Sequence, residues 1–566
     1  MTTHSRITRL QIEKYRSISE SISIDFPEDL PLILVGENNC GKSNIVRSLE
    51  LILGEQWPGS RKPDDHDFWN RTTENGPINK QVSLKGIVDS NEREVNKIVW
   101  RCNHPSNDPD YKVIYPYQER FVSNQIKEQC MVIVIGADRR LSYQLSYTTK
   151  WTLLAKLMHR FHSRLVADGE RVRRLKDKFL EIKEIFEEVS EFAGFQTELQ
   201  GYFDEMLQGM TYRLGIDFSA YDPSNFFHSL RVLPNENNQT RTFDELGTGQ
   251  EQLLAIAFAH AYAKAFFGGI VLVIEEPEAH LHPLAQLWLG KRIREMAADG
   301  LQIVITTHSP AFVDILGLPG LVLVSKEDGA TQVKQLSAKQ LADFCIKHGA
   351  KTDEKSILPF YSSNATQEIL SGFFAKKVIL VEGQTEQLSL PIYFEKIGLD
   401  FEKSGIAIVP VMGKGNLAKW WRFFSAFDIP VYLIFDNDSK NDTSGTKRKD
   451  VLATLGILNP ESVQYYLSSD EWLIENNFSV FGSDFETILR QNFQDYAIFE
   501  NEAKDNIGST KPLVARYVAN ELDVNEEQGW NNIRDMKIKI ENLGNDFSGF
   551  ENEEYSPDEE PADIPF

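Results

Sequence analysis

Two pairs of acidic residues in the second half of the chain have the spacing of a metal site. Glu382 and Glu386 are the ends of Glu382-Gly-Gln-Thr-Glu386, and Asp436 and Asp438 flank a single asparagine. Carboxylates this close repel one another unless a cation lies between them. Oxygen ligands with room for water suit Mg²⁺ or Mn²⁺. The spacing therefore predicts a site for divalent cations.

A second group, in the first half of the chain, has the pattern of a phosphate-binding loop. It reads Gly36-Glu-Asn-Asn-Cys-Gly41-Lys42-Ser43. The glycines let backbone N–H groups converge on phosphates, Lys42 would reach the β and γ oxygens, and the Ser43 hydroxyl would bind Mg²⁺. We therefore expect ATP at this loop. The expected nucleotide contacts are Asn39, Gly41, Lys42, Ser43 and Asn44.

Two later segments would complete an ATPase site. The apolar run Ile270–Ile274 ends in Glu275 and Glu276, at a strand end where ligands of open α/β sheets bind. Glu275 is expected to hold magnesium through water, and Glu276 to orient or deprotonate the attacking water. His308 follows another apolar run and is expected to sense the γ-phosphate. A lone histidine is more often structural, so this role depends on the other motifs.

A glycine-rich segment opens a predicted helix before these strands. Its sequence is Leu246-Gly247-Thr248-Gly249-Gln250. The unpaired N–H groups and the dipole of a helix start suit a γ-phosphate. Glycine-rich helix starts are common, so Gly247, Gly249 and Gln250 are candidates only because the phosphate loop is present.

The elements that must position these residues are alternating strands and helices of the α/β class. Continuous apolar runs predict buried parallel strands, and nearly every motif above follows one of them. Since the carboxyl ends of parallel strands share one edge of a sheet, the four acids should converge there. The predicted strands are Arg6–Ile12, Leu30–Val35, Ile270–Ile274, Ile303–Thr307, Lys377–Val381, Ile406–Val409 and Val431–Phe435. Residues of about 325–370 are expected to form a polar connector.

Length and composition set broad limits. A chain of 566 residues is too long for one core, so two or three domains are expected. No apolar run approaches 18 residues and no signal sequence is found, so we expect a cytoplasmic protein without membrane contact. Four isolated cysteines give neither a zinc-site nor a disulfide pattern. The net charge of −23 argues against DNA binding over the whole surface, although Lys447-Arg-Lys449 offers a local phosphate-binding patch.

The motifs resemble those of known families. Leu10-Gln-Ile-Glu-Lys-Tyr-Arg-Ser-Ile18, the phosphate loop and Glu275-Glu-Pro-Glu-Ala-His280-Leu-His282 resemble the RecF/SMC branch of ABC-type ATPases. A strand with Glu-Gly-x-x-Glu, followed by a strand with Asp-x-Asp, resembles the Toprim fold. Glu275 departs from the usual aspartate, and the two histidines replace an aspartate-bearing loop. Both departures occur in the OLD (overcoming lysogenization defect) family of ATP-coupled endonucleases, whose domain order this chain resembles.

The resemblance implies an ABC-type ATPase domain with a helical insertion, followed by a Toprim domain with helical additions. The ATPase domain would comprise residues 1–150 and 226–368, and the Toprim nuclease domain residues 369–545. Residues 151–225 show helical spacing and are expected to dimerise. Residues 546–566 form an acidic tail that is expected to be disordered. In such ATPases the segment at 246–250 completes the partner's ATP site.

The resemblance also extends the metal site. Asp484-Phe-Glu486 resembles an additional acidic motif of OLD nucleases, and Lys511 resembles their characteristic basic residue, which can stabilise charge on a phosphorane. Either segment could instead be a helix cap or a surface loop. The segment Gly413-Lys-Gly-Asn416 would be a contact to the DNA backbone or a plain turn. The metal ligands are then expected to be Glu382, Glu386, Asp436, Asp438, Asp484 and Glu486, with Ser43 binding Mg²⁺ in the ATP site.

The function implied is metal-dependent nicking or cleavage of DNA, in a homodimer or a higher homo-oligomer, in defence against phage. Gabija and some retron systems use such proteins beside a helicase or a reverse transcriptase with its nucleic acid, which allows for a partner of this kind. An alternative is an ATP-gated DNA clamp or repair mediator whose Toprim domain only binds. A topoisomerase would need a nucleophilic tyrosine in a dedicated domain, and a primase a zinc-binding segment; neither is identifiable.

Overall fold

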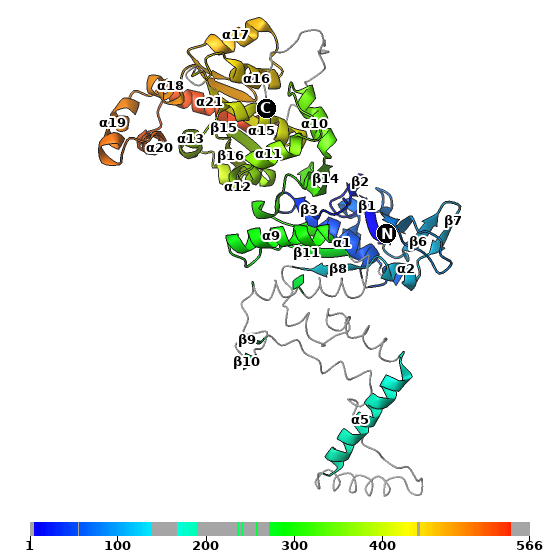
Figure 1. Cartoon of the computed structure of the whole chain (residues 1–566). Helices are drawn as coiled ribbons and strands as arrows, with labels where there is room; N and C mark the ends of the chain where they lie inside the picture. Colours follow the sequence, from blue (N-terminus) through cyan, green and yellow to red (C-terminus); the bar gives the residue numbers. More distant parts are fainter. Residues whose placement is uncertain are drawn as a thin grey trace, which may run out of the picture.

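The computed structural model describes residues 5–54, 56–60, 62–136, 167–188, 235–236, 239–240, 249, 256–257, 271–438 and 442–544. Figure 1 shows two α/β bodies, with the C-terminal body stacked on the N-terminal one. The helix α5 (Gly169–Glu187) lies at the far end from the C-terminal body. This helix lies within residues 151–225, where helical spacing is predicted; residues 151–166 and 189–225 fall outside the described residues. None of the helices described could span a membrane.

The first body contains a parallel sheet that carries the phosphate loop. Its strand order is β14-β13-β3-β12-β11-β8, and every neighbouring pair is parallel except β13 and β14. All residues of the central strand β3 are buried, which explains its continuous apolar run. The strands are β3 (Leu32–Val35), β8 (Val132–Ile135), β11 (Val271–Glu275), β12 (Gln302–Thr306), β13 (Leu321–Glu327) and β14 (Ala330–Gln335).

A six-stranded antiparallel sheet covers one side of this body. Its order is β2-β1-β4-β5-β6-β7, and β4 alternates buried and partly exposed side chains as a sheet with one apolar face should. Helix α1 (Lys42–Leu53) packs Ile45, Leu49 and Ile52 into the core shared with this sheet. The strands are β1 (Arg6–Glu13), β2 (Ile22–Asp25), β4 (Ile78–Lys85), β5 (Lys97–Cys102), β6 (Asp110–Tyr115) and β7 (Gln118–Phe121).

The second body is built on a five-stranded sheet of order β16-β15-β17-β19-β18, parallel except at β18. Side chains of β15 alternate between two cores. Val378 and Leu380 enter one with helix α15 (Leu417–Ala426), and Ile379 and Val381 enter the other with α13 (Gln384–Lys396). The strands are β15 (Lys377–Val381), β16 (Ile406–Pro410), β17 (Val431–Asp436), β18 (Trp472–Ile474) and β19 (Phe478–Phe481).

Further helices surround this sheet. They are α14 (Phe401–Ser404), α16 (Thr446–Thr454), α17 (Pro460–Ser468), α18 (Phe485–Asn492), α19 (Tyr496–Asn506), α20 (Lys511–Glu521) and α21 (Gln528–Asn542). The predicted strands agree with the observed ones to within two residues at each end. The α/β class and the order of the two domains are confirmed.

The expectation of a polar connector at about 325–370 is wrong. This segment contains β14 and the helices α10 (Ala338–Lys347) and α11 (Ile357–Asn364), which bury Leu341 and Tyr361. Most of its buried apolar residues belong to one core that runs from β3 to β17. The two bodies therefore share a continuous core. The sequence did not indicate this core, because most residues of the segment are polar.

An aromatic cluster forms the centre of this junction. The Phe373 ring lies 5.7 Å from that of Phe423 and 5.1 Å from that of Phe427, in edge-to-face arrangements. The Tyr361 ring lies 4.7 Å from Phe423, and its hydroxyl donates to the carbonyl oxygen of Lys419 at 2.8 Å. Such ring pairs stabilise a fold by more than their buried area alone would. Phe373 is therefore expected to contribute strongly to the stability of the second body.

Replacing Phe373 by alanine should lower the free energy of unfolding by roughly 3–5 kcal/mol, because it leaves a cavity in the shared core. Denaturant titration followed by circular dichroism measures this. The matched control is Ile346→Ala, since Ile346 is half exposed and should change stability by less than about 0.5 kcal/mol. Equal effects of the two substitutions would contradict a shared core.

Candidate functional site

The phosphate loop connects β3 to α1, and at two of its positions only glycine fits. Gly36 and Gly41 have φ angles of 140° and 117°, in the region that side chains other than glycine rarely adopt. A Cβ atom on Gly36 would lie 2.0 Å from the carbonyl oxygen of Val324, and one on Gly41 would lie 2.2 Å from Thr331 Oγ1. The loop is therefore closely packed against β13 and β14. Asn39 has a φ of 62° and is exposed on the loop.

The Lys42 ammonium is folded onto the loop itself. It donates to the carbonyl oxygens of Gly36 at 2.8 Å and Glu37 at 2.7 Å. Burial lowers the pKa of Lys42, while Cys40, Glu276 and Glu278 act to raise it. Glu276 and Glu278, which follow β11, therefore lie within electrostatic range of the Lys42 ammonium.

Four residues from three segments fix the loop through a chain of hydrogen bonds. Asn44 Nδ2 donates to Ser17 Oγ at 2.8 Å, and Ser17 Oγ lies 2.7 Å from Thr331 Oγ1. Thr331 Oγ1 donates to the carbonyl oxygen of Cys40 at 2.8 Å. Sequence reasoning missed Thr331, because nothing near it on β14 marks a functional residue. Ser17 lies in the Leu10–Ile18 motif, for which the sequence predicted no role.

The acids after β11 meet His308 at the same edge of the sheet. Glu276 has a left-handed φ of 49°, and its N–H donates to the Thr306 carbonyl at 2.9 Å. Glu278 accepts from Thr307 Oγ1 at 2.8 Å and from the His308 N–H at 2.6 Å. Burial lowers the pKa of His308, Lys42 lowers it further, and Glu276 acts to raise it. Glu275 ends β11 as predicted, and Glu278 joins the two strand ends, a role that sequence reasoning missed.

Of the segment 246–250, the structure describes Gly249 alone. A Cβ atom on Gly249 would lie 2.7 Å from the carbonyl oxygen of His280, so this glycine packs directly on the loop after β11. Gly247 and Gln250 lie outside the described residues.

The predicted carboxylates meet at one edge of the second body's sheet. Glu382 follows β15 and Asp436 ends β17, and the Asp436 N–H donates to Glu382 Oε1 at 3.1 Å. Glu386 lies in the first turn of α13, where its Oε2 accepts from the Gly383 N–H at 3.2 Å. The strand order places β15 beside β17, which is why acids 54 residues apart in the chain come together.

Burial and mutual repulsion perturb these acids strongly. Burial and the nearby Asp436 raise the pKa of Glu382 to about 8, against the opposing effect of Lys414. Burial, with Asp436 and Glu486 as further causes, raises the pKa of Glu386 to about 7. Such shifts arise where like charges are gathered in a low dielectric. A donor set of carboxylates alone fits a hard divalent cation, and Glu382, Glu386, Asp436, Asp438 and Glu486 are the residues that would hold it.

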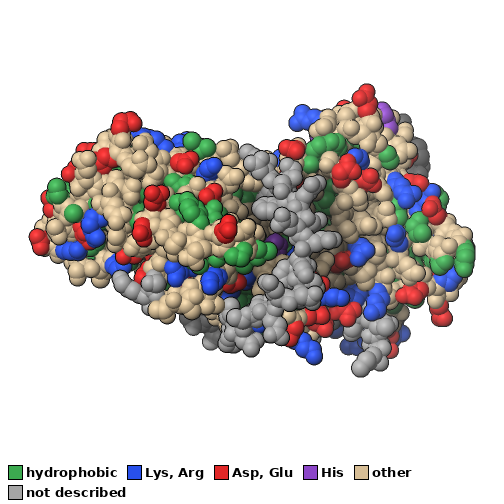
Figure 2. Space-filling model, turned by 90° about the horizontal axis from the view of Figure 1, so that it is seen from above, with side chains coloured by type: hydrophobic (Ala, Val, Ile, Leu, Met, Phe, Trp, Pro, Cys, Tyr) green, Lys and Arg blue, Asp and Glu red, His purple; other side chains and the backbone are tan. Residues whose placement is uncertain are grey.

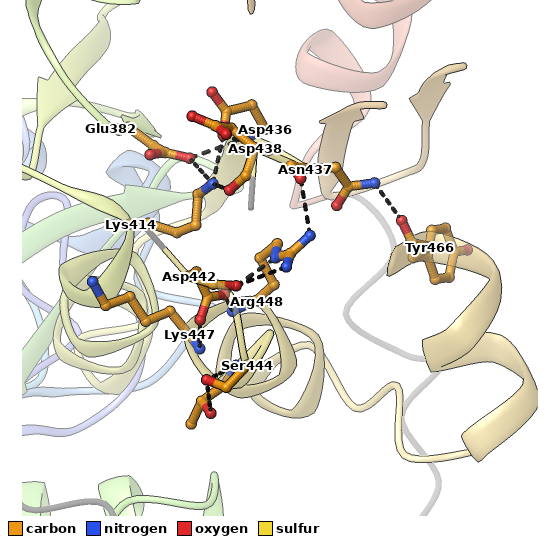
Figure 3. A network of polar contacts seen from close by, with 11 residues as sticks. Glu382, Lys414, Asp436, Asn437, Asp438, Asp442, Ser444, Lys447, Arg448 and Tyr466 are labelled. Carbon is orange, nitrogen blue, oxygen red and sulfur yellow. Dashed lines mark hydrogen bonds and ion pairs between the residues drawn. The ribbon is translucent and has the colours of Figure 1, made fainter. Parts of the chain in front are cut away.

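Lys414 lies among these acids, which neither interpretation of the Gly413–Asn416 segment expected. Its Nζ atom is 2.5 Å from Asp436 Oδ1 and 3.5 Å from Glu382 Oε1, and donates to the Asp438 carbonyl oxygen at 3.2 Å. Figure 3 shows the ammonium pointing between Glu382 and Asp436. The side chain is 8% exposed. It is therefore an internal ion-pair partner of the acidic site rather than a surface contact or a plain turn.

The later acidic motif lies beside the same site. Lys511, the first residue of α20, donates to Glu486 at 3.1 Å. Burial acts to lower the pKa of Lys511, but its partner Glu486 raises it, and Asp484 and Asp436 act in the same direction. Asp484 is the N-cap of α18, with its oxygens accepting from the Thr487 N–H and hydroxyl, both at 2.9 Å. The helix-cap interpretation thus describes Asp484, while its role as a metal ligand stays a prediction.

The expected basic patch at 447–449 needs a correction. Arg448 is buried, and its Nε lies 3.1 Å from Asp442 Oδ2 while Nη1 donates to the Asn437 carbonyl oxygen at 2.9 Å. Asn437 Nδ2 in turn donates to the Tyr466 carbonyl oxygen at 2.6 Å. Arg448 therefore positions the Asp436–Asp438 segment from behind (Figure 3) and is not available to a phosphate. Lys447 and Lys449 are exposed on α16.

Comparisons with known proteins agree with both domains. A family model described as "Overcoming lysogenization defect protein-like, TOPRIM domain" matches residues 373–438, and one described as "AAA ATPase domain" matches residues 6–150 and 106–313. The chain is 26% identical over 463 residues to the OLD nuclease of Thermus scotoductus, covering 76% of this chain and 82% of that protein. It is 22% identical over 355 residues to endonuclease GajA of Bacillus cereus, covering 56% and 50%.

Three further likenesses are weaker. The Old nuclease of Escherichia phage P2 is 27% identical over 185 residues, covering 32% of this chain and 30% of that protein. Among solved structures, the Smc head domain of Pyrococcus furiosus has 15% identity, covers 61% of this chain and 99% of that chain, and has a TM-score of 0.36. Stu0660 of Streptococcus thermophilus has 12% identity, coverages of 63% and 85%, and a TM-score of 0.39. At these scores, neither structure adds to the fold described above.

The raised pKa values predict how the metal-free protein responds to pH. The folded state keeps protons on Glu382 and Glu386 that the unfolded chain releases above about pH 4.5, so stability from these groups is lost as pH rises through about 7–8. In EDTA, the free energy of unfolding should fall by roughly 1–3 kcal/mol more between about pH 6 and about pH 9 in the wild type than in Glu382→Gln. Parallel pH profiles for the two proteins would show that Glu382 is not perturbed.

Proposed function

Because this chain belongs to the AAA ATPase family and continues into an OLD-like TOPRIM domain, we propose that it is an ATP-regulated, divalent-metal-dependent DNA endonuclease. The observation that carries the proposal is the convergence of Glu382, Glu386 and Asp436 with the Glu486–Lys511 pair at one sheet edge. The relatives named as nucleases support a phosphodiester substrate. The convergence of acids makes a purely binding role for this domain less favourable than catalysis.

Each part of this edge has a distinct task in the proposed reaction. Divalent ions, when bound, supply the activated water and neutralise the leaving oxygen. Glu382, Glu386, Asp436, Asp438 and Glu486 would hold them. Lys511 stays protonated beside Glu486, and its ammonium can stabilise negative charge on the phosphorane. Arg448 keeps the Asp436–Asp438 segment in place through the Asn437 carbonyl.

DNA would be held by local basic positions. Figure 2 shows acidic and basic side chains interspersed on the face that it presents, rather than one basic field. Lys447 and Lys449 are exposed near the start of α16, and the Lys447 stem lies against Gly415, where a Cβ atom would be 3.5 Å from Lys447 Cδ. Contacts of this kind are salt-dependent. On the resemblance to the OLD family, we extend the proposal to a homo-oligomer acting in defence against phage.

Plasmid nicking tests the proposal directly. Supercoiled plasmid incubated with the full chain and Mn²⁺ or Mg²⁺ should be nicked, and Glu382→Gln should lower the rate by roughly 100-fold or more, since it removes a ligand that no neighbour replaces. The matched control is Glu402→Gln, an exposed glutamate of α14, which should keep the wild-type rate. Nicking that survives in Glu382→Gln would refute the assignment. DNA binding without cleavage, with and without ATP, would favour the clamp instead.

A contact between the two bodies supports regulation by ATP. Glu37 of the phosphate loop lies beside the start of the second sheet, where a Cβ atom on Gly405 would be 3.2 Å from both Glu37 Oε1 and Lys376 Cγ. Burial raises the pKa of Glu37, while Lys376 and Lys42 act to lower it. Lys334 of β14 and Asp428 form a second link, 2.6 Å apart. Movement of the loop on nucleotide binding would therefore reach β15 and β16 directly.

Lys376→Met should weaken the change in nicking rate that ATP produces, by about threefold or more, while leaving nucleotide-free nicking near the wild-type rate. Lys42→Ala should lose the response to ATP altogether, and its nucleotide-free nicking should fall far less than that of Glu382→Gln. Nicking rates with and without ATP, measured across these variants, check both expectations. An equal loss of nucleotide-free cleavage in Lys42→Ala and Glu382→Gln would contradict this division of roles.

A further inference from the structure

Lys414 is held in its buried position by a turn with little freedom. Gly413 has a φ of 119°, in the region that favours glycine, and its N–H donates to the Glu382 carbonyl oxygen at 2.8 Å. Asn416 Nδ2 donates to the Val411 carbonyl oxygen at 2.9 Å. The turn is thus fastened to the backbone of a metal-ligand candidate, and its lysine side chain is directed at the neighbouring acids.

The ammonium is shared among the acids of the metal site. A lysine ammonium has three donors, and Lys414 Nζ contacts Asp436 Oδ1, Glu382 Oε1 and the Asp438 carbonyl oxygen. A lysine is almost never buried to 8% exposure unless it is paired. Here the pairing involves carboxylates that a divalent cation would also need, so ammonium and metal ion compete for the same oxygens.

The spacing of the acids fits a site that an ammonium holds open. Within the described part of the chain, only Asp64, His66 and Asp67 offer three ligand atoms that all lie within 4.8 Å of one another. Glu382, Glu386 and Asp436 do not meet this spacing. Magnesium requires oxygens at roughly 2.0–2.1 Å, so these carboxylates have to close around an ion, and the Lys414 ammonium lies between two of them (Figure 3).

We propose that Lys414 is a tethered counter-ion, which neutralises the Glu382–Asp436 pair until a divalent cation displaces its ammonium, and that the displaced ammonium then contacts a DNA phosphate. The inference rests on the proposed function, because it takes this edge as the metal site of a nuclease. Two cations at one carboxylate pair repel each other, so metal binding and Lys414 binding exclude one another. Metal and DNA then bind cooperatively, since DNA gives the released ammonium a new partner close to Lys447.

Metal titration tests the exchange without any measurement of cleavage. Mn²⁺ binding to the full, nucleotide-free chain is followed by calorimetry, with Glu382→Gln identifying the heat that belongs to this site. Lys414→Met should bind Mn²⁺ about fivefold or more tightly than the wild type, because no internal cation has to leave. In EDTA, the melting temperature of Lys414→Met should be lower than that of the wild type. Saturating Mn²⁺ should raise the melting temperature of Lys414→Met by more than it raises that of the wild type. Lys403→Met, an exposed lysine of α14, carries the same charge change and should bind as the wild type does.

A second measurement uses the unaltered protein, in case Lys414→Met does not fold. Reductive methylation read by mass spectrometry should label Lys414 slowly in EDTA and severalfold faster when Mn²⁺ is saturating. Unchanged Mn²⁺ affinity in Lys414→Met, or unchanged labelling of Lys414, would overturn the counter-ion role while leaving the nuclease proposal intact. If wild type and Glu382→Gln bind Mn²⁺ alike, the metal site itself is wrong, and the counter-ion role falls with it.

Discussion

Buried negative charge is the constraint that organises the second body. The order of β15 and β17 forces Glu382 and Asp436 to one edge, where burial makes two adjacent charges costly. Three cations compensate this charge. Lys414 pairs with Asp436, and Lys511 pairs with Glu486. Arg448 pairs with Asp442, next to the Asp436–Asp438 segment. The acids can be held close together because each of these cations is placed by its own turn or helix start.

The two sites of the chain solve a similar problem in a similar way. In each, a glycine with a φ near 120° precedes a buried lysine at the carboxyl edge of a mainly parallel sheet: Gly41 before Lys42 and Gly413 before Lys414. In each, the ammonium bonds to carbonyl oxygens of its own neighbourhood and lies within the field of glutamates or aspartates. A lysine held this way can exchange its carbonyl partners for phosphate oxygens, because charged oxygens are stronger acceptors than neutral carbonyls.

The sequence was most informative where chemistry follows a buried strand. Apolar runs ending in Glu382, Asp436 and Glu275 located the strands and the edge on which these acids lie. The proximity of Glu382 and Asp436 follows from the order of the strands in the sheet. The roles of Lys414 and Arg448 depend instead on the direction of a side chain after a turn, and periodicity carries no such information. Thr331 was invisible for a related reason, since its contact with Cys40 spans 291 residues. The segment at about 325–370 was misjudged because sparse apolar residues within a polar stretch complete a core supplied mostly by other elements.

The aromatic junction has a consequence for the modularity of the chain. The residues matched by the TOPRIM model begin at residue 373, yet the Phe373 ring belongs to a cluster completed by Tyr361, which lies before that boundary. A fragment starting there would keep its acids but leave Phe423 and its neighbours with an uncovered apolar face. The physical boundary of the second body therefore lies before α10, and a recombination event between the two halves would have to carry α10 and α11 along with the C-terminal half.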